Sequence, residues 1–526
     1  MLHIKLTHNK GYKWFSRNNV HVKGYILTPD NRLLKDGNLA DYFLPAQTLD
    51  DFKRKLQQAN GLYAVVIQKD DRTLCAVDTT RAFPLFYYQN DGILAITDNP
   101  DELASENIPL TIDETGVVIM QYAGFVTGSR TLLKNIFQIQ AGEYICFANN
   151  TSQKEFHTRF LSETLFSLSR NELKQALKQA LLKVGEHLVK ALDGRTAVIP
   201  LSGGFDSRII AYLLKKHNYP SVFCYTYGKS GNVELQNARA TAEKLGFDWY
   251  FVEYDEFFNR KMNEEPLFKD YTHFSACYSS QSAEQDYFGM EKLFSLNKIP
   301  ANAVFIPGHS GVIAGELVIP EMENPAFNYV DYALETTFMQ LFPRKKEISI
   351  IQKEIDSLHN ELTDKYPPYL AYENWRFRET TAKFGHNGAK IWDFFGYEYL
   401  LPLWDSELFN FFVKVPSQYK YSKNLYKETL GEMFEEYGIS FYKDELIPSA
   451  KLLRKVAFRS KLKKNFPILK MFINIWRTDR TGAQFFLQSF VDELKKSGFR
   501  RKITNINGIL SAWYLLQVKR KMNAKY

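Results

Sequence analysis

The chain has 526 residues, which is enough for at least two domains. Hydrophobic residues make up 45% and charged residues 24% of it, as in an ordinary globular protein, and no apolar run reaches the ~18–20 residues that span a bilayer. The net charge of +8 is modest for this length, so it does not indicate a nucleic-acid partner. Four scattered cysteines predict neither a disulfide framework nor a zinc site. We expect a cytoplasmic protein with no transmembrane segment.

The first third of the chain predicts antiparallel hairpins. Four short apolar runs lie at residues 61–67, 73–78, 84–88 and 93–97, separated by turn residues. The stretch resembles the class II glutamine amidotransferase domain of asparagine synthetases in Gly61-x-Tyr63-Ala64, Asp78-x-x-Arg81 and Pro84-Leu85-Phe86-Tyr87-Tyr88. The resemblance implies an α+β antiparallel domain of the Ntn-hydrolase type over residues 1–155.

One departure from that family concerns the nucleophile. In the family it is an N-terminal cysteine whose own α-amine serves as the base, whereas residue 2 here is Leu2. The first cysteine, Cys75, falls inside a predicted strand, where a thiol lacks both the free amine and exposure. We expect that this domain does not hydrolyse glutamine and that free ammonia or a substrate amine supplies the nitrogen.

The second region opens with a predicted phosphate-binding loop. A buried-type strand at residues 196–200 leads into a turn and a helix-like run at residues 208–214. The turn itself reads Leu201-Ser202-Gly203-Gly204-Phe205-Asp206-Ser207. Adjacent glycines let the backbone approach an anion, and the amides and dipole of the following helix favour negative charge. The two serines add hydroxyl donors, and Asp206 can hold Mg²⁺ beside the phosphates.

This loop resembles the pyrophosphate loop of the N-type ATP pyrophosphatases, which cleave ATP between the α and β phosphates. Further strands at residues 221–227 and 249–252, with helical spacing at 234–245, predict a parallel α/β sheet. The resemblance implies an adenine nucleotide α-hydrolase-like (HUP-type) synthetase domain over residues 165–450. It also implies that the loop binds ATP and that Tyr227 and Gly228 border the adenine site.

A second glycine-rich loop follows at residues 304–316. It resembles the second loop of asparagine synthetases, Gly-Asp/Glu-Gly-x-Asp-Glu-x-x-Gly-Gly, in position and in glycine content. The acidic residues differ, because His309 stands near the first acid and Val312-Ile313 replace the Asp-Glu pair. The resemblance implies that Gly308 and His309 face the nucleotide and that Glu316 takes over as a metal ligand. The alternative is a turn at the sheet edge with no ligands.

Two later segments carry the rest of the resemblance. Residues 396–405 resemble Gly-Val-Glu-Ala-Arg-x-Pro-Phe-Leu-Asp, and they keep Gly396, Glu398, Pro402 and Asp405. The family's Lys-x-x-Leu-Arg is loosely matched by residues 423–427. The resemblance implies catalytic roles for Glu398 and for Lys423, whose cation would stabilise charge that develops on phosphate. The alternative interpretation is that Lys423 is a surface lysine without a catalytic role.

Two basic stretches admit two interpretations each. Aromatic and charged residues alternate at 372–383, and the charged ones include Arg376, Arg378 and Glu379. One interpretation is that these residues line a pocket for an acidic acceptor. The interpretation that we favour is a packed helical core in which the arginines extend their charged ends to solvent. Residues 451–526 predict a basic helical C-terminal extension. For its residues 451–470, which include no acidic residue, a solvated helix face is favoured over a surface for an anionic partner or membrane.

The sequence therefore predicts an ATP-dependent, Mg²⁺-using ligase that adenylates a small-molecule carboxylate and transfers it to ammonia or an amine. A sugar acid of surface polysaccharide biosynthesis is one acceptor suggested by analogy. Asparagine synthase itself, ammonia- or glutamine-dependent, stays open, as does a non-catalytic scaffold with a degenerate site. A tRNA-modifying, thiolating enzyme is less favoured because paired cysteines and a strongly basic domain are missing. The oligomeric state, including a homodimer, is also open.

Overall fold

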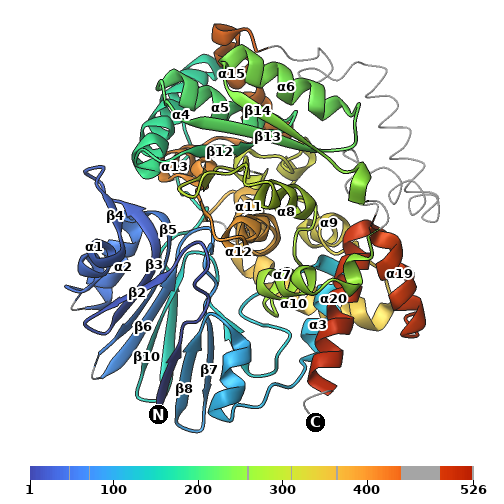
Figure 1. Cartoon of the computed structure of the whole chain (residues 1–526). Coiled ribbons are helices and arrows are strands. Elements are labelled where there is room, and N and C mark those ends of the chain that lie inside the picture. The colour runs from blue at the N-terminus through green and yellow to red at the C-terminus, as the bar shows by residue number, and fades with distance from the viewer. Residues whose placement is uncertain are drawn as a thin grey trace.

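The computed structural model describes residues 1–439 and 486–523, apart from residues 47, 70, 258–259, 310 and 363–364. Two layered parts lie side by side in Figure 1: a pair of sheets formed by the first 156 residues and a parallel sheet further along the chain. Helices from the middle and the end of the chain fill the space beside them.

The N-terminal part contains two sheets flanked by three helices. Its strands are β1 (Leu2–Lys5), β2 (Trp14–Arg17), β3 (Val20–Leu27), β4 (Leu33–Lys35), β5 (Asn60–Gln68), β6 (Arg72–Val77), β7 (Phe86–Asn90), β8 (Ile93–Thr97), β9 (Ile136–Gln138), β10 (Glu143–Ala148) and β11 (Thr151–Phe156). Its helices are α1 (Asp36–Phe43), α2 (Leu49–Gln58) and α3 (Glu114–Ala123). The sheets run β1-β8-β7-β9 and β11-β10-β6-β5-β3-β2, with β4 on β3. All pairs are antiparallel except β1 with β8, so the predicted hairpins are confirmed.

Both faces of the central strands β5 and β6 in the larger sheet are buried, which explains their almost uninterrupted apolar sequences. In β5, Leu62 and Ala64 join the core that continues into the second part of the chain, while Tyr63 and Val65 face the core beneath α1 and α2. This alternation has the period of two that a strand imposes.

The second part is a five-stranded sheet in which every pair is parallel, as predicted. Its elements are α4 (Arg170–Leu192), β12 (Ala197–Pro200), α5 (Phe205–Lys216), β13 (Val222–Gly228), α6 (Val233–Leu245), β14 (Asp248–Glu253), β15 (Val304–Phe305) and β16 (Glu398–Tyr399). The order β14-β13-β12-β15-β16 changes direction at β12. The loops after β12 and β15 therefore meet at a topological switch point, where such sheets bind ligands.

The other helices of the described residues are α7 (Pro266–Ala276), α8 (Tyr287–Ser295), α9 (Tyr329–Thr336), α10 (Lys345–Glu361), α11 (Pro368–Arg376), a π-helix (Phe377–Gly385), α12 (Lys390–Phe394), α13 (Ser406–Phe412), α14 (Ser417–Lys420), α15 (Asn424–Phe434), α19 (Leu487–Lys496) and α20 (Ile506–Asn523). None of the helices in the described ranges is long and apolar enough to cross a membrane.

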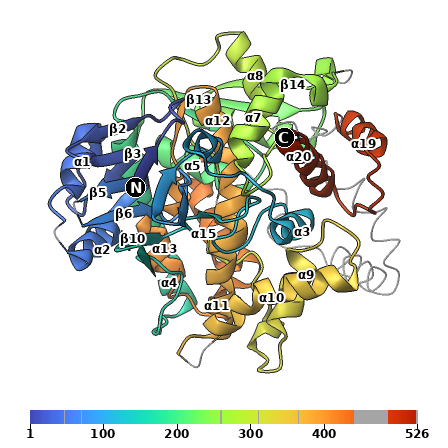
Figure 2. The same cartoon turned by 90° about the horizontal axis from the view of Figure 1, so that it is seen from below.

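The described end of the chain is helical, as the sequence predicts, and packs against the rest of the fold. Helix α20 packs against α3 and α19 (Figure 2) and buries Trp513 and Tyr514. The Tyr514 hydroxyl accepts a hydrogen bond from the Tyr278 amide at 3.0 Å, and Lys521 pairs with Asp101 at 2.6 Å. This segment is part of the core. The most basic stretch, residues 451–470, lies outside the described residues.

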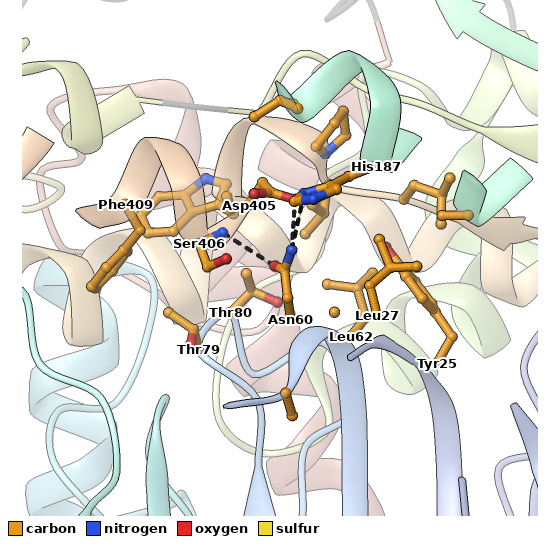
Figure 3. A pocket seen from close by; sticks show the side chains of 18 of the residues that line it. Tyr25, Leu27, Asn60, Leu62, Thr79, Thr80, His187, Asp405, Ser406 and Phe409 are labelled. Atoms are coloured by element: carbon orange, nitrogen blue, oxygen red, sulfur yellow. Dashed lines mark hydrogen bonds and ion pairs between the residues drawn. The ribbon is translucent and has the colours of Figure 1, made fainter. Parts of the chain in front are cut away.

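The two parts share one core and are joined by buried polar contacts. The Gly11 and Tyr12 amides both donate to the Asp393 carboxylate, at 2.8 and 3.0 Å, and the Tyr12 hydroxyl donates to the Tyr399 carbonyl at 2.6 Å. A cavity of about 100 Å³ lies between the parts (Figure 3). There Asp405 accepts from Asn60 at 2.8 Å and lies 2.9 Å from the His187 ring.

Candidate active site

The loop after β12 is held closed by its own serines. The Ser202 amide donates to the Ser207 hydroxyl at 3.0 Å, and the two hydroxyls lie 3.1 Å apart. The Gly204 amide donates to Ser202 Oγ at 3.2 Å. Helix α5 begins directly after Gly204 and has no side-chain cap, so the positive end of its dipole faces the loop.

Leu201 and Arg208 hold this loop in place through hydrogen bonds. Leu201 is fully buried, and its amide and carbonyl bond to the next strand, at Tyr225 and Thr226, so it anchors the loop without facing a ligand. Arg208 donates to the Gly203 carbonyl at 2.7 Å and to the Gly204 carbonyl at 3.1 Å. Sequence reasoning missed Arg208, although a cation one helical turn after the glycines is a visible signal.

The second loop lies directly against the first. A Cβ on Gly308 would come within 2.6 Å of the Ser207 amide nitrogen, which is closer than real Cβ atoms approach, so a glycine is needed here. The next residue, His309, has a buried Nδ1 with no hydrogen-bond partner among the described residues. Burial lowers the pKa of His309 to about 4 against the opposing charge of Asp206, so its ring is neutral at pH 7.

Glu316 reaches the phosphate loop despite its shifted position in the sequence. Gly315, with φ +83°, brings the chain against Lys420, where a Cβ would lie 2.5 Å from the lysine Cβ. Glu316 then places its carboxylate 3.5 Å from Lys423 Nζ, and Asp206 Oδ2 lies 3.4 Å from the same nitrogen. The structure thus brings together three residues that the sequence assigned separately.

The backbone around Lys423 is unusual. Ser422 and Lys423 have φ of 52° and 62°, consecutive left-handed conformations that are uncommon for residues other than glycine. Such conformations cost free energy and cluster at functional sites. The side chain is mostly buried, and burial lowers the pKa of Lys423, but the carboxylates of Asp206 and Glu316 outweigh it, so the pKa is raised. Lys423 is therefore a fixed cation at the loop.

The surroundings of Asp206 fit a magnesium ion. Its Oδ1 is buried and has no hydrogen-bond partner among the described residues, and the same holds for the nearby Tyr426 hydroxyl. Burial and the Asp206 charge raise the pKa of Tyr426 well above its usual value, so it stays a neutral hydroxyl. A hard cation prefers such carboxylate oxygens. Within the described ranges, no group of three or more His, Cys, Asp or Glu side chains could hold a metal alone.

Two more predicted residues line the carboxyl edge at the end of β13. Tyr227 stacks on Tyr254 with ring centroids 5.3 Å apart, and the Gly228 carbonyl accepts from the Tyr254 amide. Burial, followed by the charge of Asp286, raises the pKa of Tyr227 well above its usual value. Tyr227 and Gly228 thus end the strand that pairs with β12, whose own carboxyl end carries the phosphate loop.

The structure does not bring Glu398 into this cluster. It pairs with Val304 at the start of β15, and its carboxylate binds Arg195 at 2.6 Å and Lys35 at 2.9 Å. Arg195 precedes β12, so this network lies at the amino ends of the strands, whereas the phosphate loop follows their carboxyl ends. Glu398 links the N-terminal part to the parallel sheet.

Comparison with known proteins adds one finding for this region. Residues 184–285, which contain the phosphate loop and β12–β14, match the family model described as Asparagine synthase. Because the match includes the loop and the strands on which it is mounted, it supports an ATP-dependent synthetase domain over this part of the chain.

The individual proteins to which the chain is similar are distant. It is 32% identical over 77 residues to the tRNA-specific 2-thiouridylase MnmA of Beijerinckia indica subsp. indica, a stretch covering 12% of this chain and 18% of that relative. Among solved structures it is similar to an NH₃-dependent NAD synthetase from Campylobacter jejuni (15% identity, 41% of this chain, 96% of the other, TM-score 0.23). It is also similar to an NMN synthetase from Francisella tularensis (15%, 57% and 96%, TM-score 0.20). These TM-scores are too low for either structure to support an inference about this chain.

Proposed function

We propose that the protein is an ATP-dependent, AMP- and pyrophosphate-forming carbon–nitrogen ligase of the asparagine synthetase type. The observation that carries the proposal is the position of Lys423, which lies within 3.5 Å of both Asp206 and Glu316 beside the phosphate loop. A fixed cation and a carboxylate with a free oxygen are what the transfer of an adenylyl group requires.

In the proposed reaction, an oxygen of the acceptor carboxylate attacks the α-phosphorus of ATP, and pyrophosphate leaves. Ammonia or an amine then attacks the acyl carbon, and AMP leaves. Ser202, Gly203, Gly204 and Ser207 would hold the departing pyrophosphate, and Lys423 would stabilise its charge. Asp206, with Glu316, would hold Mg²⁺, which supplies charge neutralisation on the phosphates. Tyr227 and Gly228 would border the adenine.

The nitrogen source in this proposal is free ammonia or an amine. All four cysteines are buried, and burial raises the pKa of each thiol, so none is poised as a nucleophile. We accordingly propose that residues 1–155 form an amidotransferase-like domain that serves as a structural partner of the synthetase. The same buried thiols do not favour the thiolating alternative, because sulfur transfer needs an accessible thiolate.

The test is pyrophosphate release from purified protein with MgATP, ammonium and a panel of carboxylates that includes aspartate and uronic acids. Release that depends on one acid and disappears in Asp206→Ala supports the ligase and identifies its acceptor class. MgATP-dependent thermal stabilisation without release for any acid would instead support a scaffold with an occupied nucleotide site. Glutamate release from glutamine would contradict the proposed nitrogen source.

A further inference from the structure

Two links that are distant in the sequence meet at the surface beside α10. The link between α9 and α10 runs alongside the link between α19 and α20, where Leu341 and Ile503 form an antiparallel bridge. The Phe342 amide donates to the Lys502 carbonyl at 3.0 Å. All four helices lie on the same side of the molecule in both views (Figure 1, Figure 2). The two links therefore form one continuous surface.

The first link presents two large apolar side chains to solvent. Met339 and Phe342 are 39% and 45% exposed, whereas their neighbours Phe338 and Leu341 are 4% and 2% exposed. The buried pair anchors the link, so the exposed pair is held in an outward position. Single exposed apolar residues are common on proteins, but two within one short link form a patch that a partner can cover.

Cations surround this exposed pair. Residues 339–346 and 499–504 contain no acidic residue and six cations: Arg344, Lys345, Lys346, Arg500, Arg501 and Lys502. Arg501 is paired with Glu347 at 2.7 Å. The other five are exposed, and no carboxylate in the described part of the chain lies within ion-pair distance of them. We call these five cations, with Met339 and Phe342, the basic–apolar patch.

Three cations of the patch stand where a helix least favours them. Arg344 is the N-cap residue of α10 and gives no side-chain cap, and Lys345 and Lys346 are the first two residues of the helix. The positive end of a helix dipole attracts anions and opposes cations. Glu347, the acid that would complement this dipole, is bound by Arg501. The arrangement costs free energy in the isolated chain, and contact with an anionic partner would offset that cost.

The combination of groups distinguishes between the anionic or apolar partners that could cover the patch. A nucleic acid matches the cations, but Met339 has no flat ring to stack on a base. A second copy of the chain, in a two-fold contact of the patch with itself, would bring cations against cations. A membrane with anionic lipids matches both features, because headgroups attract the cations and apolar side chains enter the boundary between headgroups and acyl chains.

We propose that the basic–apolar patch docks the protein on an anionic membrane surface. Met339 and Phe342 enter the boundary between headgroups and acyl chains, and the five cations contact the lipid headgroups. This docking is peripheral, since no helix within the described ranges is long and apolar enough to cross a membrane. The inference does not depend on the proposed function, because docking requires neither nucleotide nor acceptor.

The experiment is flotation of the full chain with vesicles of phosphatidylcholine alone and of phosphatidylcholine mixed equally with phosphatidylglycerol, at about 0.15 M salt. We expect binding to the mixed vesicles only. One Lys or Arg near an anionic surface strengthens binding about fivefold, so the double variant Lys345→Gln, Lys346→Gln should weaken it about 10- to 30-fold. Phe342→Ser should weaken it about 5- to 10-fold, because part of a phenylalanine side chain leaves water on docking.

Two remote changes are the matched controls. The double variant Lys13→Gln, Lys134→Gln removes the same charge from exposed positions of the N-terminal part. Phe294→Ser changes a phenylalanine on α8 that is 49% exposed, close to the exposure of Phe342. Both controls should bind the mixed vesicles as wild type does. All four variants should keep the wild-type melting temperature, because every changed side chain is exposed.

The proposal is overturned if the mixed vesicles do not bind the wild-type protein, or if the controls weaken binding as much as the patch variants do. Equal binding to phosphatidylcholine alone would also overturn it. So would tighter binding to a duplex RNA at matched phosphate concentration, or a dimer in solution that Phe342→Ser dissociates. Weakening by the lysine changes without any effect of Phe342→Ser would leave only non-specific attraction and would likewise overturn it.

Discussion

Replacing Lys423 by methionine removes the cation that lies between two carboxylates while keeping a side chain of similar length. At 3.4 Å and an effective dielectric of about 20, the attraction between Lys423 and Asp206 is roughly 5 kcal/mol before desolvation is subtracted. Glu316 is 56% exposed, so its share is about 1 kcal/mol or less. Since burial opposes the charge on Lys423, we expect the net loss of folding stability to stay within about 2 kcal/mol.

The effect on activity should be much larger than the effect on stability. Groups that stabilise charge only in the transition state contribute about 10²–10³-fold in rate. We therefore expect Lys423→Met to lower pyrophosphate release by about that factor while MgATP still raises the melting temperature. Both quantities are measured on one preparation, by a coupled pyrophosphate assay and by thermal unfolding.

Lys420→Met provides the opposite pattern as a control. Lys420 is fully buried against Glu373 at 2.7 Å, so its loss leaves an unpaired buried carboxylate and should cost about 3–5 kcal/mol. Lys423→Met should therefore fold and fail to react, whereas Lys420→Met should fold poorly. Pyrophosphate release by Lys423→Met within about threefold of wild type would refute the reasoning, since a cation that stabilises transition-state charge contributes a much larger factor.

Three further predictions address the two loops of the candidate site and the contact between the two parts of the chain. Gly308→Ala should destabilise the protein by about 1–3 kcal/mol and lower pyrophosphate release, because the new Cβ would collide with the Ser207 amide. An unchanged free energy of unfolding in denaturant titrations would contradict this prediction, since it would show that the two loops can move apart. Arg208→Lys should weaken MgATP stabilisation, because one ammonium cannot replace the fork on two carbonyls, and equal nucleotide affinity in a titration would contradict this. Burial lowers the pKa of His187, but the hydrogen bond and charge of Asp405 raise it overall. The pair of His187 and Asp405 therefore stabilises the folded protein fully at pH values below the pKa of this histidine in the unfolded chain. That stabilisation is lost as the pH rises through the pKa of His187 in the folded protein. His187→Gln should thus cost more stability at pH 5 than at pH 8.5 in denaturant titrations, and an equal cost at both would refute the assignment.

Local pattern alone predicted the strand–turn–helix layout around the glycines. The apolar run ending at Pro200, the paired glycines and the helical spacing after Ser207 are short-range signals, and the structure confirms the strand, the helix and the parallel pairing. The binding of phosphate by this loop stays a prediction. The apolar run at residues 61–67, bounded by turn residues, likewise identified the strand β5, although the sequence did not show that both of its faces are covered.

The sequence by itself determined that Asp206 and Lys423 are candidate site residues, because their neighbours resemble a known pattern. Only the tertiary structure decided which candidates meet. It brought Glu316 to Lys423 across more than a hundred residues and placed Glu398 at the other end of the strands. It also separated Arg376 from Arg378, two arginines that the sequence treats alike, by giving a carboxylate to only one. The physical reason is that charge pairing depends on distances of a few ångströms between side chains of remote segments, which no local periodicity encodes.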